Sequence, residues 1–176
     1  MTFRPDLDDF GAFYERTYQA AYRTAVAIVR DPALAADVTQ DAFVSAYRQR
    51  DRFRGDAPGH AWLHRIVVNE AISACRRRRF TVREFDVDRP DGRDDATRTS
   101  DRMLLLTALD TLSPTHRAAV VLRYYHGYDY ATIAGILATT STNVGAILSR
   151  SLDRLRVTLE GSHLEPAVVG EVSRGR

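Results

Sequence analysis

Residues 113–159 read SPTHRAAVVLRYYHGYDYATIAGILATTSTNVGAILSRSLDRLRVTL, and this stretch predicts three helices separated by short polar turns. Ser113 is a suitable N-cap for the first helix, Pro114 suits its first turn, and Gly127 marks its end. Asp129 is placed to cap a short second helix, and the small polar residues ATTST predict a turn before a longer third helix. A short helix, a small polar turn and a longer helix form the pattern of a helix-turn-helix.

Two amphipathic helices are predicted near the N-terminus. The first runs from Asp6 to Val29 and carries aromatic and aliphatic residues on one broad face. Asp31 and Pro32 separate it from the second, whose apolar stripe extends to Tyr47. The chain has no segment with strand periodicity and no internal repeat, so the sequence predicts an all-α fold.

The segment Phe53–Arg79 reads FRGDAPGHAWLHRIVVNEAISACRRRR, a glycine-broken loop followed by a helix that ends in four arginines. Between Ser45 and Phe80 there are nine arginines and three carboxylates, a local net charge of +6. Phosphates attract such arginines whatever the base sequence, whereas neighbours such as Asn69 can carry sequence information through base contacts. One or two arginines would suffice to favour the dipole at a helix C-terminus, so four indicate nucleic-acid binding.

The bulk composition excludes several classes of protein. The chain has 176 residues, of which 44% are hydrophobic, and a formal net charge of +2, so it is long and apolar enough for packed cores. No apolar run approaches the roughly 18–20 residues that span a bilayer, so we expect no membrane insertion and a cytoplasmic location. The lone Cys75 cannot form an internal disulfide and is expected to be a buried, inert thiol.

A change of composition divides the chain into two parts. Residues 81–100 are rich in acids and arginines and almost free of apolar side chains, which predicts a flexible linker. We therefore expect two small helical domains, 1–80 and 101–160, followed by a C-terminal tail, 161–176.

The order of three segments carries a family resemblance. These are DVTQDAFVSAYR at 37–48, FRGDAPGHAWLHRIVVN at 53–69 and LDTLSPTHRAAVVLRYYHGYDYATIAGIL at 109–137. Over residues 7–157 the chain resembles a bacterial extracytoplasmic-function (ECF) sigma factor. The resemblance implies that the protein binds core RNA polymerase and directs promoter-specific transcription initiation, as for a stress or developmental regulon. It also implies a region 2 bundle that reads and melts the minus-ten element, a region 4 helix-turn-helix that reads the minus-thirty-five duplex, and an anti-sigma factor as a further partner.

The resemblance assigns roles to particular positions. The residues expected to bind core polymerase are Asp37, Gln40, Asp41, Phe43 and Tyr47. Those expected at the minus-ten element are Trp62, Arg65, Asn69, Arg76, Arg77, Arg78 and Arg79. Those expected at the minus-thirty-five element are Thr142, Asn143, Ala146, Ser149, Arg150 and Arg154. The amide of Asn69 can pair with the edge of an extruded base, and the arginines can hold the backbone of the opened strand.

Some of these residues also have simpler structural interpretations. Phe43 and Tyr47 lie on the apolar stripe and are expected in the core, whereas the polar members of their set can face a partner. Trp62 is likewise expected to pack more than to contact DNA.

The front of the third helix of the helix-turn-helix departs from the family pattern. The family commonly has basic or polar groups where this chain has Gly145 and Ile147, so fewer charged DNA contacts are expected there. Arg150 and Arg154 stay in register, although they could also form a solvated face with Asp153 as partner.

The sequence is also compatible in part with two other classes of function. A stand-alone helix-turn-helix regulator would account for residues 113–156 but not for the N-terminal segments. An enzyme would need a site: His60 and His64 have i, i+4 spacing, but no glutamate of an HExxH motif lies between them and no third ligand is evident. We therefore expect solvated histidines, no metal, no cofactor and no catalytic residue.

Overall fold

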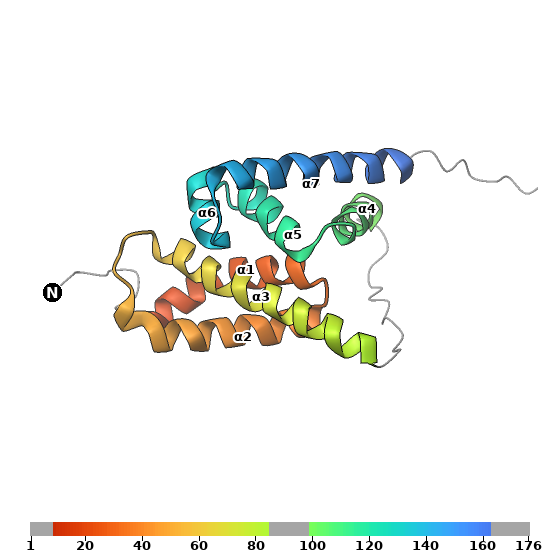
Figure 1. Cartoon of the computed structure of the whole chain (residues 1–176). Helices are drawn as coiled ribbons and strands as arrows, with labels where there is room; N and C mark the ends of the chain where they lie inside the picture. Colours follow the sequence, from red (N-terminus) through yellow and green to blue (C-terminus); the bar gives the residue numbers. More distant parts are fainter. Residues whose placement is uncertain (1–8, 85–98, 163–176) are drawn as a thin grey trace, which may run out of the picture.

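A computed structural model of the protein describes residues 9–84 and 99–162. Every regular element in these two ranges is helical, which confirms the predicted all-α fold. In chain order (Figure 1), the elements are α1 (Phe10–Val29), α2 (Pro32–Gln49), the 3₁₀ turn η1 (Arg50–Arg52), α3 (Gly59–Glu84), α4 (Thr99–Asp110), α5 (Pro114–Val120), the π-helical turn η2 (Val121–Tyr125), α6 (Tyr130–Leu137) and α7 (Ser141–Ser162).

The helix ends differ from the sequence prediction at the middle of the chain. Helix α3 continues past the four arginines to Glu84, and α4 already begins at Thr99, so both ends of the predicted linker 81–100 are helical. The rest of that linker and most of the predicted tail lie outside the described residues, as does the start of the first helix at Asp6.

Side-chain caps fix where several helices begin. The carboxylate of Asp129 accepts the backbone N–H of Thr132 at 2.8 Å, and the Ser113 hydroxyl accepts that of His116 at 3.3 Å. Both predicted caps are therefore confirmed, because each satisfies a donor that the first turn leaves unpaired. Gly127 has φ +71, a conformation suited to glycine, where the chain turns toward α6.

Helices α1, α2 and α3 form an N-terminal bundle in which each helix packs on the other two. Its centre is filled by apolar side chains, which include Phe13 and Ile28 on the predicted stripe of the first helix and Leu63, Val67 and Val68 of α3. The apolar spacing of about 3.6 residues aligns these side chains on one face of each helix, which is why the bundle closes.

The C-terminal half contains the predicted helix-turn-helix. Helices α6 and α7 meet at a bend of 95°, with Ala138 in the left-handed conformation at φ 51 between them. Helix α4 packs on α7, and a small separate cluster of Ala108, Leu109, Leu112 and Leu155 holds it there. Among the described helices, none alone is long and apolar enough to cross a membrane, and α6 with α7 meets that criterion of length and composition only when the two are joined across their bend.

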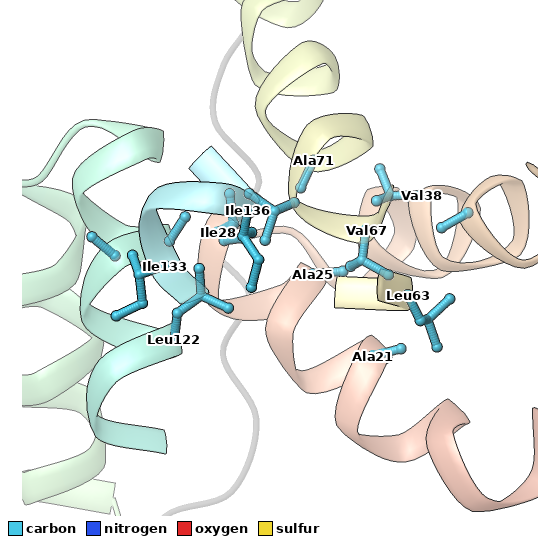
Figure 2. Close-up of a cluster of buried hydrophobic side chains, with 14 of the residues drawn as sticks. Ala21, Ala25, Ile28, Val38, Leu63, Val67, Ala71, Leu122, Ile133 and Ile136 are labelled. Atoms are coloured by element: carbon cyan, nitrogen blue, oxygen red, sulfur yellow. The ribbon is translucent and has the colours of Figure 1, made fainter. Parts of the chain in front are cut away.

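The two halves share one buried core. Figure 2 shows Leu122, Ile133 and Ile136 of the C-terminal half facing the bundle residues Ile28 and Ala71 in a single apolar cluster. Helix α6 packs on α3, and α5 packs on both α1 and α3. Two helical units were predicted, but their direct contact was not, because no periodicity within one segment reveals which distant segment covers it.

Candidate nucleic-acid interface

The polar residues expected to face a partner lie on the outer side of α2. The exposed members of this set are Asp37, Gln40 and Asp41. Phe43 is in the core, as predicted, with 4% of its surface exposed, whereas Tyr47 is 50% exposed. The prediction of a core position is therefore wrong for Tyr47. Its ring sits at the rim of the bundle, with its centroid 5.2 Å from that of Phe10.

An open groove of about 480 Å³ lies between α1 and α2 beside these residues. Its lining is Phe10, Tyr14, Tyr18, Ala36, Gln40, Phe43, Val44, Tyr47 and Arg48. The aromatic side chains of α1 lie on one broad face, as predicted, but Tyr14 is 42% exposed because the aromatic stripe is broader than the surface that α2 covers. Exposed aromatic rings next to a polar rim are typical of protein interfaces.

The first turns of α3 present a polar stripe beside a packed tryptophan. Trp62 is half-buried against Phe53, with ring centroids 5.1 Å apart, so it packs as predicted. Arg65 and Asn69 are both exposed and lie one helical turn apart. Their side chains can therefore reach one strand of nucleic acid together.

The four arginines at the end of α3 are not equivalent. Arg78 donates to the carboxylate of Asp31 at 2.9 Å, which ties α3 to the start of α2. Arg76 and Arg79 are exposed. Sequence alone could not rank the four, because the pairing of Arg78 depends on a carboxylate 47 positions away along the chain.

Helix α7 presents the predicted recognition face to solvent. All six positions are exposed: Thr142, Asn143, Ala146, Ser149, Arg150 and Arg154. At the start of the helix, the Asn143 side-chain amide donates to the Thr139 hydroxyl at 2.8 Å, and Arg150 Nε donates to the Ala146 carbonyl at 3.1 Å. Both contacts orient side chains that could otherwise take many rotamers.

The two positions that depart from the family pattern have different environments. Ile147 is 6% exposed and belongs to the core, so its side chain does not contribute to the outer face. At Gly145 an added Cβ would lie 3.5 Å from the ring of Tyr130, an ordinary contact distance. Arg123 lies over the same tyrosine ring, 5.3 Å from its centroid. This pair was not predicted, although the run RYYHGYDY at 123–130 is unusually aromatic.

The histidines are not a solvated pair. His60 is exposed, but His64 is 3% exposed, so the prediction is wrong for His64, which the C-terminal half covers. His64 Nδ1 lies 2.8 Å from the Tyr128 hydroxyl, and its ring centroid is 3.9 Å from that of His126. Burial, together with the neighbouring histidines, lowers the pKa of His64 to about 3. Within residues 9–84 and 99–162, no three His, Cys, Asp or Glu side chains are grouped to hold a metal ion.

Cys75 of α3 packs against α1 within the N-terminal bundle. It is half-buried, and its Sγ is 3.8 Å from the carbonyl oxygen of Ile28. Burial raises the pKa of this thiol, which disfavours the reactive thiolate.

Comparison with known proteins identifies the family. Residues 13–81 match Sigma-70 region 2, and residues 102–155 match Sigma-70, region 4. The ECF RNA polymerase sigma factor SigL of Mycobacterium tuberculosis is 30% identical over 85% of this chain and 88% of its own length. The chain belongs to the ECF sigma factors.

Further relatives and solved structures resemble the chain over most of its length. The RNA polymerase sigma-E factor of Streptomyces avermitilis is 33% identical over 93% of this chain and 92% of its own length. The sigma factor RpoE of Bartonella quintana, solved with the anti-sigma factor NepR, aligns with a TM-score of 0.76 at 25% identity, covering 88% of this chain and 98% of that one. CnrH, solved with the cytosolic domain of CnrY, aligns with a TM-score of 0.65 at 26% identity over 86% of this chain and 88% of that one.

The function follows from the family. As a sigma factor, the protein directs the initiation of transcription by RNA polymerase at promoters. Sigma factors of this kind are initiation factors that do not catalyse the reaction themselves. A stand-alone helix-turn-helix regulator would leave the N-terminal segments unexplained, whereas in a sigma factor they form region 2.

Proposed function

We propose that the exposed face of α2, together with the aromatic groove beside it, is where this sigma factor docks on core RNA polymerase. Asp37, Gln40 and Asp41 would form the polar contacts, and Tyr47 would supply an exposed ring at their edge. Phe43 would support this surface from the core, since it is buried and its ring packs against that of Tyr14, with centroids 4.6 Å apart. A rim of carboxylates around exposed aromatic side chains matches the composition expected of a specific protein interface.

The N-terminal domain, 1–80, reads and melts the minus-ten element in this proposal. Asn69 offers one donor and one acceptor to a base edge, and Arg65 lies one turn away to hold a phosphate. Arg76 and Arg79 would add backbone contacts at the far end of the helix, while Arg78 already pairs with Asp31. Extruding a base costs a few kcal/mol, which amide pairing and stacking offset at favoured bases.

The C-terminal domain, 101–160, reads the minus-thirty-five element as duplex. The exposed face of α7 is long enough to lie in a major groove, with Thr142 and Asn143 near its N-terminal end. Arg150 and Arg154 follow on the same face, one turn apart. The observation that supports the whole proposal best is that one chain exposes two separate polar stripes, one on α3 and one on α7.

Core polymerase would hold both DNA-reading helices, α3 and α7, at one promoter. Each half offers only a few base contacts, but once polymerase holds one half at the promoter, the contact of the other becomes effectively intramolecular. Because the RpoE relative was solved with an anti-sigma factor, we propose that this chain also has such a partner. Its place of action is the cytoplasm, where polymerase and promoters are found.

Run-off transcription with purified core polymerase and a genomic promoter library tests the proposal. The chain is expected to yield transcripts from a defined set of promoters that share two sequence elements. Core polymerase alone is the control. Absence of transcripts above that control, or transcripts without shared elements, would contradict the proposal.

A further inference from the structure

The contact between the N-terminal and C-terminal halves limits how far apart α3 and α7, the two helices proposed to read the promoter, can lie. The two promoter elements are named for positions about 25 base pairs apart, which corresponds to roughly 80 Å along B-form DNA. A compact body of this chain's size is roughly 40 Å across. In the structure α3 packs on α6, and α6 packs on α7, so both readers belong to one such body (Figure 1). The chain must therefore open before α3 and α7 can occupy both elements of one promoter.

The contact is apolar at its centre and polar at one edge. Ile136, Ile133 and Leu122 fill the centre from the C-terminal side. At the edge, rings from both halves come together: His64 from α3 and His126 from the turn after η2, with centroids 3.9 Å apart. The strength of the apolar packing does not depend on pH, whereas the contacts of the histidine rings at this edge do.

Each histidine of the edge is bonded to the opposite half. His64 Nδ1 lies 2.8 Å from the hydroxyl of Tyr128, and His126 Nε2 lies 2.8 Å from the hydroxyl of Thr24 in α1. His60 stacks on Tyr128 from the exposed side, with centroids 6.0 Å apart. A hydroxyl can donate to a neutral ring nitrogen or accept from it, so both bonds form without any charge on the rings.

The surroundings of the two rings disfavour a positive charge. The cationic side chains at this edge are Arg23, which donates to the Tyr125 hydroxyl at 3.2 Å, and Arg123, which donates to the Tyr128 carbonyl at 2.9 Å. On α3 itself the neighbouring Arg65 is exposed. Asp129, which follows Tyr128 in the sequence, carries an exposed carboxylate that caps α6. The two rings contact the hydroxyl-bearing side chains of Thr24, Tyr125 and Tyr128, and a third imidazole, that of His60, lies beside His64.

We propose that His64 and His126 form an acid-sensitive latch, which holds the two halves in a closed state unable to span a promoter and releases them when the rings are protonated. This inference rests on the proposed assignment of α3 and α7 as the two promoter readers.

The direction of the pH effect follows from the two states. Burial lowers the pKa of His64 to about 3 and that of His126 to about 4 in the closed chain, against an ordinary value of 6.5 once exposed. Above 6.5 both states hold neutral rings, so the latch is at full strength. As the pH falls below 6.5, only the open chain takes up protons, and the effect saturates near the closed-state values. From pH 7.5 to 5, each ring shifts the equilibrium toward the open chain by about 30-fold, and both together by several hundred-fold.

Small-angle X-ray scattering of the full chain at pH 7.5 and pH 5 tests the latch, with far-UV circular dichroism as a check on folding. The unaltered chain is expected to increase its radius of gyration at pH 5 while it keeps its helical signal. The double variant His64→Phe with His126→Phe keeps two rings but cannot be protonated, so it should stay compact at both pH values. His126→Arg places a permanent charge at the edge and should expand the chain at pH 7.5.

His116→Gln is the matched control, because His116 contacts Ser151 within the C-terminal half and takes no part in the latch. It should open with acid as the unaltered chain does. An unchanged radius of gyration in the unaltered chain, or equal expansion of the double phenylalanine variant, would overturn the proposal. Scattering involves neither polymerase nor DNA, so a failure of the latch is distinguishable from a failure of the promoter assignments, which run-off transcription tests separately.

Discussion

Arg30 Nε donates to the Asp110 carboxylate at 2.9 Å, and this ion pair joins the end of α1 to the end of α4 across the boundary between the halves. The same carboxylate oxygen lies 3.4 Å from Arg117 of α5. Arg30 has φ 62, the left-handed conformation that ends α1, and its backbone N–H donates to the Val26 carbonyl at 2.9 Å. The turn after α1 thus aims a side chain at the other half.

Asp110→Asn should weaken the ion pair with Arg30 while it keeps a side chain of the same size and shape. The amide keeps one oxygen acceptor but loses the charge that two arginines share. Because Asp110 is partly exposed, we expect a loss of about 1 kcal/mol in the free energy of unfolding, measured by urea titration. Asp153→Asn, at an exposed position of α7, is the control and should change stability by less than about 0.5 kcal/mol. Equal effects of the two variants would show that the pair contributes nothing measurable.

Phe43 and Tyr47 should respond differently to alanine, although both lie on the same predicted stripe. Phe43→Ala removes a core ring and should cost about 3–5 kcal/mol of stability. Tyr47→Ala removes a half-exposed ring, so the fold should persist while affinity for core polymerase falls. Thermal unfolding and a pull-down with purified core polymerase separate the two effects. Full polymerase binding by Tyr47→Ala would exclude this residue from the interface.

The same pair shows what a sequence can and cannot predict here. Periodicity places Phe43 and Tyr47 on one face of α2, but how far that face is covered depends on where α1 begins, and its first residue, Phe10, lies beside Tyr47. Caps such as Ser113 and Asp129 were predictable because a cap acts within three residues. The burial of His64 was not, because Tyr128 lies 64 positions further along the chain.

Replacement by arginine should have different effects at Gly145 and at Ile147. At Gly145 a Cβ meets only the ring of Tyr130 at ordinary contact distance, so Gly145→Arg should be tolerated. It should strengthen duplex binding and make that binding more dependent on salt, because a further phosphate contact releases a further counterion. Ile147→Arg places a charge in the core and should cost about 3 kcal/mol or more of stability.

Fluorescence anisotropy of a labelled duplex across a salt series, beside urea titration of both variants, checks this prediction. A stable Ile147→Arg variant with improved DNA binding would contradict the core position of Ile147. An unchanged salt dependence for Gly145→Arg would mean that the start of α7 does not approach the phosphates.

Arg76 and Arg78 provide a matched comparison within the arginine cluster. Arg78→Ala breaks the ion pair with Asp31 and should lower stability by about 0.5–1 kcal/mol, with little change in binding of single-stranded DNA. Arg76→Ala should leave stability unchanged and weaken that binding, because an exposed arginine is available to phosphate. The reverse ranking, measured with a labelled oligonucleotide of the non-template strand, would assign the phosphate contact to Arg78.

Asn69→Ala should impair promoter opening more than polymerase binding. Asn69 is exposed on α3, so its loss leaves the bundle intact but removes the donor and acceptor proposed to pair with an extruded base. Permanganate footprinting, at holoenzyme concentrations adjusted to equal promoter occupancy, should show reduced thymine reactivity in the minus-ten region. Glu70→Ala, the next residue on the same helix, serves as the control because its loss removes no proposed base contact. Equal melting by Asn69→Ala and the unaltered chain would exclude Asn69 as a base reader and leave Arg65 as the nearest candidate on that face.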